Sequence, residues 1–263
     1  MTARSNAHIH RYGVVASTQS IAFDLAEQGA VDGTAVVADV QTEGRGRRGR
    51  TWQAEPGTSL LVSIVLRPRL AAERLPLLSF AAALAVAGAV DRLTDIKARL
   101  KWPNDVLVNG RKVAGILLES RISDRSTVVV VGIGLNLTQE SFPPMLSRTA
   151  TSVWIESSRR ITPDAALPVL LAQLDAWRTR LEAEGFAPLR ARWLELADTI
   201  GRQIRVGDVT GAAIDLGMDG ALLVDADGSF HRVIAGDVIE SNKAAGTEPV
   251  VHRSKDRRDV ARR

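Results

Sequence analysis

The sequence predicts an α+β fold, with a larger domain over residues 8–198 and a small β-domain over residues 199–241. Up to residue 198, segments rich in β-branched residues alternate with longer apolar or amphipathic segments of helical length. From residue 199 the chain changes to short alternating segments separated by Asp-Gly turns. This second pattern is typical of a small β-barrel of the SH3 type.

The first half of the larger domain is predicted to mix strands and helices. Residues 11–18 predict a short strand that runs into a helix start, where Ser17 or Thr18 can cap a helix that ends near Gly29. The further elements of this half are two strands and an apolar helix, predicted over residues 34–41, 59–68 and 76–93.

The second half is predicted to begin with a β-hairpin. Residues 98–120 place apolar runs on either side of an Asn-Gly pair, and Asn-Gly in that position is the strongest short hairpin signal. The valine-rich segment 126–137 predicts a strand that is buried on both faces. Two amphipathic helices are then expected over 163–184 and 186–198, separated by Gly185.

The net charge of +4 is concentrated at the C-terminus. Residues 243–263 carry seven Lys or Arg and three Asp or Glu, so the rest of the chain has equal numbers of basic and acidic residues. The segment 242–263 also has little apolar content, and we expect a basic, disordered tail there. The two predicted domains together carry no net charge, so we expect no general electrostatic attraction to nucleic acid.

Composition excludes several classes of site. The chain has no cysteine, which excludes disulfides, thiolate zinc sites and cysteine nucleophiles. Its four histidines lie near the ends or in the last third, so we expect no histidine metal site and no Ser-His-Asp triad. There is no signal-peptide pattern, and the longest apolar run, residues 80–90, is too short to span a bilayer. These observations predict a cytoplasmic protein without membrane contact.

The segment 41–50 has an unusual composition, with four arginines and three glycines between Gly44 and Arg50. It fits G-x-G-x-x-G, but a Pro-Gly turn and a strand follow it, where a dinucleotide site requires a helix to begin. Arg/Gly segments that bind nucleic acid are longer and carry more aromatic residues, although this alternative stays open. A plain surface turn would leave four arginines with only Glu43 and Glu55 as acidic neighbours in sequence. Because guanidinium and glycine N–H groups bind phosphate and carboxylate well, the composition favours a small, doubly anionic ligand.

Four motifs together resemble one family. "STQS" (17–20), "QTEGRGRRGRTW" (41–52), "KWPNDVLVNGRKVAGILLE" (101–119) and "GIGLN" (132–136) occur in the order and approximate spacing seen in biotin protein ligases. The resemblance covers about residues 17–198 and extends to the SH3-like C-terminal domain that this family usually carries. It implies a biotin/lipoate-ligase-like catalytic domain, a mixed sheet with helices, before that small barrel.

The resemblance implies a reaction in two steps. The carboxylate of biotin attacks the α-phosphorus of Mg²⁺-bound ATP, which gives biotinyl-5′-AMP and pyrophosphate. A lysine of a biotin carboxyl carrier domain of an acyl-CoA carboxylase then attacks this anhydride and releases AMP. Since both steps gather negative charge, we expect catalysis by positioning and by cationic stabilisation. Mg²⁺ would be held mostly by phosphates and water, so the family implies no dedicated protein site for it.

The resemblance also implies roles for individual residues. It implies that Lys112 contacts the biotin carboxylate and the adenylate, and that Asp105 orients the incoming amine. The catalytic residues that it implies are Lys112, Arg45, Arg47 and Asp105. The biotin-binding residues that it implies are Ser17, Thr18, Gln41, Gly44, Arg45, Arg47, Lys112, Gly115, Gly132 and Gly134. The ATP-binding residues that it implies are Arg47, Arg50, Trp52, Lys101, Asn104, Lys112 and Asn136.

The residues alone allow plainer interpretations. Ser17 and Thr18 can act as helix caps, Trp52 as a core residue, Asp105 as a turn cap and Lys112 as a solvated hairpin lysine. The family commonly has Ser-Thr-Asn where this chain has Gln19 at the third position, so no role is carried over to Gln19.

Two further expectations concern the kind of ligase. The chain begins shortly before the first predicted strand, so we expect the monofunctional form without an N-terminal DNA-binding domain. Lipoate and octanoate ligases share the catalytic fold but lack the arginine-glycine loop, and they are the alternative within the same class. The carboxylase subunit that serves as acceptor, the choice between monomer and homodimer, and the purpose of the tail stay open.

Overall fold

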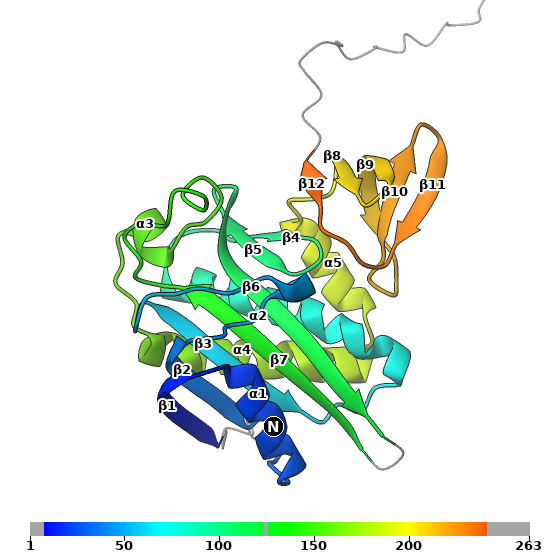
Figure 1. Ribbon diagram of the computed structural model, residues 1–263. Coiled ribbons are helices and arrows are strands. Elements are labelled where there is room, and N and C mark those ends of the chain that lie inside the picture. The colour runs from blue at the N-terminus through cyan, green and yellow to red at the C-terminus, as the bar shows by residue number, and fades with distance from the viewer. Residues whose placement is uncertain (1–7, 124–125, 241–263) are drawn as a thin grey trace, which may run out of the picture.

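The computed structural model describes residues 8–123 and 126–240, and a mixed seven-stranded sheet forms the centre of its larger part (Figure 1). The strand order is β1-β2-β3-β7-β6-β5-β4, in which β1 and β2 are parallel and all other neighbours are antiparallel. The strands are β1 (Ile9–Val15), β2 (Ala35–Gln41), β3 (Ser59–Leu66), β4 (Arg99–Lys101), β5 (Asp105–Val108), β6 (Arg111–Ile122) and β7 (Thr127–Asn136). The predicted α+β class with a mixed sheet is confirmed.

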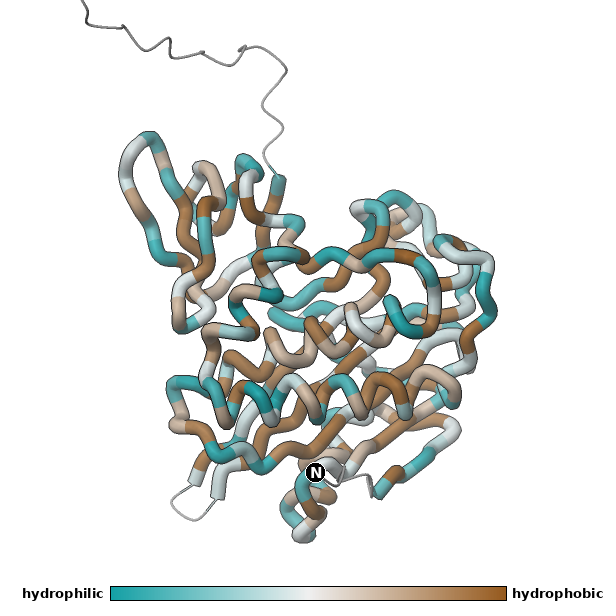
Figure 2. The backbone as a smooth tube through the Cα atoms, turned by 180° about the vertical axis from the view of Figure 1, so that it is seen from behind, coloured by the Kyte–Doolittle hydropathy of each residue, from teal (hydrophilic) through white to brown (hydrophobic). Residues whose placement is uncertain are grey.

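Helices cover the two faces of this sheet unequally. Among the described residues, one α-helix lies on the first face, α1 (Thr18–Glu27), which packs against Val36, Val65 and Val130. The opposite face carries a larger layer, which Figure 2 shows from behind. This layer consists of η2 (Ala72–Leu77), α2 (Leu78–Leu93), α4 (Pro163–Glu184) and α5 (Ala187–Leu196). A short helix, α3 (Val153–Ser157), which the sequence did not predict, lies beside the β5–β6 hairpin.

The alternation of side chains along the strands produces this inequality. Successive residues of a strand point to opposite faces. In β7, Val129, Val131 and Ile133 pack into the large core, while Val130 faces α1. Gly132 and Gly134 share the face of Val130 and carry no side chains, and Gly132 lies against the Gln19 amide at the start of α1. The α1 face is therefore apolar at one end and hollow at the other.

The predicted hairpin over residues 98–120 is wrong in its first arm. The chain forms two short antiparallel strands there, β4 and β5, joined through Trp102, Pro103 and Asn104. Proline has no N–H group for a sheet ladder, so the strand is interrupted at that point. The Asn-Gly turn is confirmed, because Asn109 and Gly110 both have positive φ angles, 49° and 75°.

The C-terminal strands form a second, antiparallel sheet in the order β11-β10-β9-β8-β12. They are β8 (Gln203–Val206), β9 (Val209–Leu216), β10 (Leu222–Ala226), β11 (Ser229–Val233) and β12 (Ile239–Glu240). The SH3-like architecture is confirmed, although among residues 203–240 no ladder joins β11 to β12 to close a barrel. The predicted boundary between residues 198 and 199 stays a prediction, and the predicted tail over 242–263 lies outside the described residues.

Trp102 connects the two sheets through hydrogen bonds. Its indole Nε1 donates to the carbonyl of Gly220 at 3.0 Å, and its backbone N–H donates to Thr199 Oγ1 at 2.9 Å. Trp102 is the first residue of the β4–β5 turn, so the second sheet is fixed against the residues that the sequence singled out.

Within the described ranges, one helical stretch, Ala72–Leu93, is long and apolar enough to cross a membrane by length and composition. Most of it is buried against the sheet and α4, which is the pattern of a core helix. This agrees with the buried helix that the sequence predicts over residues 76–93.

We expect Phe186→Ala to lower the free energy of unfolding by about 3–5 kcal/mol, because it empties a buried aromatic site. Phe186 is 2 % exposed and packs edge-on against Phe80, with ring centroids 5.2 Å apart. Phe230, which is 75 % exposed on β11, offers the same substitution as a control with a change below about 0.5 kcal/mol. Urea denaturation of both variants measures the difference, and equal losses would contradict this account of the core.

Candidate active site

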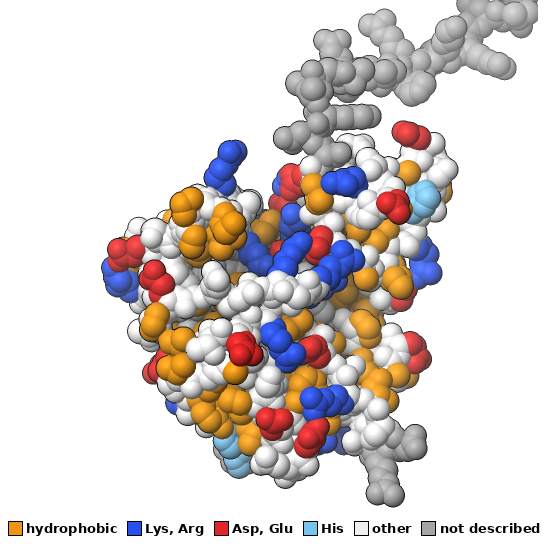
Figure 3. All heavy atoms as spheres, viewed as in Figure 1, with side chains coloured by type: hydrophobic (Ala, Val, Ile, Leu, Met, Phe, Trp, Pro, Cys, Tyr) orange, Lys and Arg blue, Asp and Glu red, His pale blue; other side chains and the backbone are white. Residues whose placement is uncertain are grey.

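A cavity of about 680 Å³ opens on the α1 face of the large sheet. Its walls come from the start of α1, the arginine-glycine loop, the β4–β5 turn, the start of β6 and the segment 142–150. The second sheet adds Arg205 and residues 237–240. In Figure 3, Lys and Arg side chains gather where the two parts of the molecule meet around this hollow.

The floor of the cavity consists of glycines on paired strands. Gly115 of β6 lies opposite Gly134 of β7, and the indole of Trp52 rests on both. A Cβ atom at Gly134 would overlap this ring, and one at Gly115 would lie 2.9 Å from it. A ligand can therefore touch these two glycines only if Trp52 moves aside. No hydrogen bond holds the ring, because its buried Nε1 has no acceptor among the described residues.

One end of the cavity is neutral and polar. Thr18, at the first turn of α1, is 3 % exposed. Its N–H and hydroxyl both lie close to Gln41 Oε1, at 2.8 and 3.0 Å, and the hydroxyl contacts Ser63 Oγ at 2.8 Å. Ser17 caps the helix by accepting the N–H of Gln19 at 3.3 Å. The structure thus brings together Ser17, Thr18 and Gln41, which the sequence assigned to one role.

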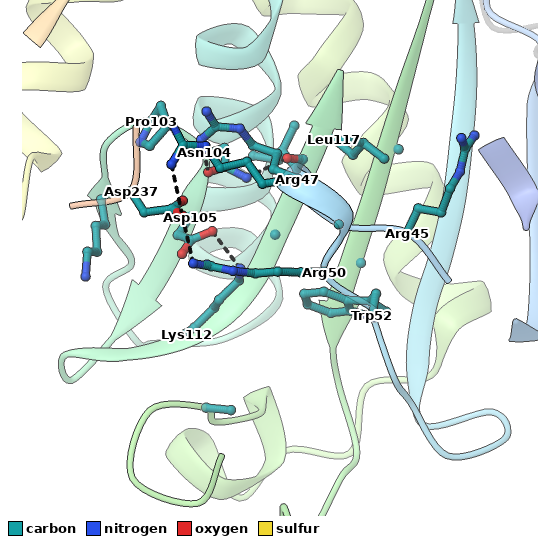
Figure 4. Close-up of a pocket in the computed structure, with 18 of the residues that line it drawn as sticks. Arg45, Arg47, Arg50, Trp52, Pro103, Asn104, Asp105, Lys112, Leu117 and Asp237 are labelled. Carbon is teal, nitrogen blue, oxygen red and sulfur yellow. Dashed lines mark hydrogen bonds and ion pairs between the residues drawn. The ribbon is translucent and has the colours of Figure 1, made fainter. Parts of the chain in front are cut away.

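The other end is cationic. Lys112 Nζ lies 2.7 Å from Asp105 Oδ1 and 5.5 Å from the centre of the Trp52 ring (Figure 4). Arg47 donates to Asn104 Oδ1 at 2.9 Å, and Arg50 lies 2.7 Å from Asp237 Oδ2. Figure 4 shows these side chains converging from the loop, the β4–β5 turn and the second sheet.

Arg47 differs from the other cations in this group, since its partner is a neutral amide oxygen. Burial lowers the pKa of its guanidinium from the ordinary value, because desolvation disfavours the charged form, while the Asp237 carboxylate acts in the opposite direction. An arginine stays protonated at neutral pH in spite of such a shift. Its charge is therefore available to an anion that enters the cavity.

Arg45 is the one predicted catalytic residue whose charged group lies apart from the others. Its guanidinium is 3.3 Å from Glu119 Oε2 on β6 and points away from Lys112, Arg47 and Arg50 (Figure 4). The loop can turn back sharply there because Gly44 has no side chain, and a Cβ atom at Gly44 would overlap the carbonyl of Trp52. Arg45 lines the main cavity, but its guanidinium has to leave Glu119 to reach a ligand beside Lys112 and Arg47.

The remaining predicted residues also line the cavity, with different partners. Lys101 lies on β4, opposite Asp105 in the ladder. Gly132 lies beside the neutral end, where Gln19 Oε1 would be 2.5 Å from a Cβ atom. Asn136 donates to the carbonyl of Thr151 at 3.0 Å and accepts from Ser59. Its amide therefore ties the segment after β7 to β3 in this structure.

Sequence reasoning missed three residues at this site: Ser63, Glu119 and Asp237. Ser63 is the single hydroxyl inside an otherwise apolar stretch of β3, which is a signal that could have been used. Glu119 is the last residue of the motif 101–119, but its contact with Arg45 depends on a bend of the arginine-glycine loop. Asp237 has no local signal at all, since its importance comes from the position of the second sheet.

Comparison with known proteins supports the family that the motifs indicate. A sequence model described as the Biotin/lipoate A/B protein ligase family matches residues 12–136. The biotin–[acetyl-CoA-carboxylase] ligase of Paracoccus denitrificans is 39 % identical over 233 residues, which cover 84 % of this chain and 96 % of that relative.

Solved structures agree in fold. The biotin protein ligase from Aquifex aeolicus in complex with biotin and ATP matches with a TM-score of 0.79 and 28 % identity, covering 89 % of this chain and 99 % of that one. The biotin protein ligase from Leishmania major in complex with biotinyl-5-AMP matches with a TM-score of 0.62 and 25 % identity, covering 87 % and 99 %.

We expect Asp237→Asn to expose the arginine-glycine loop to trypsin. Asp237 holds Arg50 at 2.7 Å and Arg48 at 3.6 Å, and each exposed ion pair contributes up to about 1 kcal/mol. Cleavage after the loop arginines should become about threefold to tenfold faster, measured by a digestion time course with mass spectrometry. Asp227→Asn, in the β10–β11 turn where φ is 52°, is the matched control. An unchanged cleavage rate in Asp237→Asn would show that these ion pairs do not hold the loop.

Proposed function

The chain belongs to the biotin/lipoate A/B protein ligase family, and on that basis we propose that it is an ATP-dependent biotin protein ligase. It forms biotinyl-5′-AMP and transfers biotin to a lysine of a biotin carboxyl carrier domain. One observation carries this proposal: a single cavity joins a neutral hydrogen-bonding end to a cationic end. Biotin has the same two halves, a neutral ureido ring and a carboxylate at the end of a chain.

In this proposal the ureido ring binds at the start of α1, where Ser17, Thr18 and Gln41 offer hydroxyl and amide groups. The carboxylate then points toward Lys112 and Arg47. Biotin can reach the backbone of Gly115 and Gly134 only after the indole of Trp52 has left these glycines. We propose that Trp52 then packs against the nucleotide, and that Gly44 and Arg45 close over the carboxylate and the α-phosphate.

In the first step, an oxygen of the biotin carboxylate bonds to the α-phosphorus while the bond to the pyrophosphate oxygen breaks. Arg47 is suited to stabilise the added charge, since it is half-buried and its partner is neutral. Lys112 supplies a second cation, and Arg50, Lys101, Asn104 and Asn136 are the proposed contacts of the nucleotide.

In the second step, the amine nitrogen of the acceptor lysine bonds to the biotin carbonyl carbon, and AMP leaves. The amine must lose a proton to attack. We propose that Asp105, whose carboxylate lies 2.7 Å from Lys112 Nζ, orients this amine or accepts its proton. The pairing of Asp105 with Lys112 links the groups used in the two steps.

Mg²⁺ is proposed to enter with ATP. Among residues 8–123 and 126–240, no group of three His, Asp or Glu side chains is placed to hold a metal ion. Three carboxylates, Asp105, Asp237 and Glu240, line the cavity, and Mg²⁺ at nucleotide sites commonly uses phosphates, waters and one or two carboxylates. These residues fit a nucleotide-borne ion, which would neutralise phosphate charge.

The acceptor is proposed to be the carrier domain of an acyl-CoA carboxylase, since the Paracoccus denitrificans relative is named for acetyl-CoA carboxylase. A cytoplasmic location, the absence of nucleic-acid binding and the choice between monomer and homodimer stay predictions.

Exchange of labelled pyrophosphate into ATP tests the function directly. With Mg²⁺ present, we expect exchange when biotin is supplied and none with lipoate or octanoate, because neither presents a ureido ring to the polar end of the cavity. Exchange with lipoate or octanoate alone would assign the chain to the other branch of the family. If none of the three acids supports exchange, the cationic end binds a different anion and the proposal is wrong.

Two variants should separate the half-reactions. Lys112→Ala should slow biotin-dependent exchange by about 10²–10³-fold, since it removes a cation aimed at the developing charge. Asp105→Asn should keep most of the exchange but lose transfer from preformed biotinyl-5′-AMP to a carrier domain, measured in a single turnover. Lys97→Ala, at an exposed lysine paired with Asp91, is the control. Near-normal exchange in Lys112→Ala would remove Lys112 from the mechanism.

A further inference from the structure

Gln19, the residue at which the chain departs from the usual Ser-Thr-Asn pattern, is buried at the polar end of the cavity with 3 % of its surface exposed. Its Nε2 donates to the carbonyl of Val130 at 3.1 Å, and its Oε1 accepts from Ser63 Oγ at 3.0 Å. A backbone carbonyl can only accept, so the NH₂ group must face Val130 and the amide oxygen must face Ser63.

This orientation fixes the next hydrogen in the network. Ser63 has a single hydroxyl proton, which it donates to Gln19 Oε1. The lone pairs of Ser63 therefore face Thr18 Oγ1, which lies 2.8 Å away. The proton in that contact has to come from Thr18.

The other end of the network is fixed in the same way. The backbone N–H of Thr18 can only donate, so the oxygen of the Gln41 amide faces it, at 2.8 Å, and the Gln41 NH₂ group points elsewhere. The Thr18 hydroxyl has two acceptors within reach, Ser63 Oγ at 2.8 Å and Gln41 Oε1 at 3.0 Å. Neither has a proton to give to Thr18, because an amide oxygen carries none and Ser63 donates its own to Gln19. The Thr18 hydroxyl therefore donates inside the network, and its lone pairs are left for a ligand.

We propose that Gln19 is a positioning residue that sets the hydrogen-bond polarity of this wall, through Ser63, and so makes Thr18 an acceptor for a ligand N–H group. The inference deepens the proposed function and rests on it. A cyclic urea carries N–H donors, and the Thr18 lone pairs on this wall can accept one of them. An alkyl or dithiolane acid has no N–H group to match it, and a buried acceptor left without a partner lowers affinity.

The packing of Gln19 supports this assignment. A Cβ atom at Gly132 would lie 2.5 Å from Gln19 Oε1, so the amide is pressed against the backbone of β7 and has little room to rotate. Its two partners belong to different strands, Ser63 to β3 and Val130 to β7. The amide is thus held from both sides in the one orientation that orders the network.

Three variants test the proposal: Gln19→Met, which keeps length but removes the acceptor, Ser63→Ala, and the double variant. Each single variant should raise the KM for biotin, and its Kd by calorimetry, about fivefold to tenfold, because one neutral hydrogen bond is lost. The kcat and the KM for ATP should stay within about twofold of wild type. The Kd of the double variant for biotin should not exceed that of the single variant that binds biotin less tightly, since both substitutions break the same network. Gln28→Met, at an exposed position after the same helix, is the control.

Unchanged biotin KM in Gln19→Met, an equal rise in the KM for ATP, or additive effects in the double variant would each overturn the proposal. If Gln19→Met does not fold, Ser63→Ala decides alone, since it removes only one hydroxyl. Failure of the proposed function would look different, because wild type itself would then show no biotin-dependent exchange.

Discussion

The architecture of the site depends on how the charges of the arginine-glycine loop are compensated. Four arginines within seven residues repel one another, and the acidic residues near them in sequence do not provide their partners. The structure supplies carboxylates from remote elements: Glu119 of β6 on one side and Asp237 of the second sheet on the other. Because the loop is held at both sides, it closes the hollow face of the large sheet into a cavity. Arg47, left with a neutral partner, becomes the cation aimed at an incoming anion.

That hollow face is a direct result of the two-residue period of the strands. Bulky residues of β3, β6 and β7 pack against α2 and α4, and the alternate positions hold Ser63, Gly115, Gly132 and Gly134. Because these glycines have no side chains, the Trp52 ring and the Gln19 amide can lie directly on the backbone of β6 and β7. One face of the sheet therefore forms the hydrophobic core, and the opposite face forms the floor of the cavity.

The sequence predicted most elements, because their signals are local: β-branched runs, the Asn-Gly turn, the cap at Ser17 and the break at Gly185. The structure brings together the polar residues Ser17, Thr18 and Gln41 and places Lys112, Arg47 and Arg50 around the same cavity, although each group comes from two separate motifs; their roles stay predictions. Sequence reasoning failed where partners are distant. The contact of Arg45 with Glu119 and the part played by Asp237 depend on tertiary positions that no local pattern encodes. The interruption at Pro103 did have a local signal, the missing N–H group of proline, which the hairpin prediction did not use.

The position of Trp52 connects the two ends of the cavity mechanically. Trp52 belongs to the same short loop as the arginines, and the loop is closed on itself by Trp52 N–H donating to Gly44 at 2.9 Å and Gly46 N–H donating to Arg50 at 2.7 Å. The ring that covers Gly115 and Gly134 is therefore carried by the same hydrogen-bonded loop as the guanidinium groups. Arg45, at the start of this loop, faces Glu119 while Trp52, at its end, rests on the glycines. The neutral floor and the cationic wall of the cavity thus share one structural element, the loop from Gly44 to Trp52.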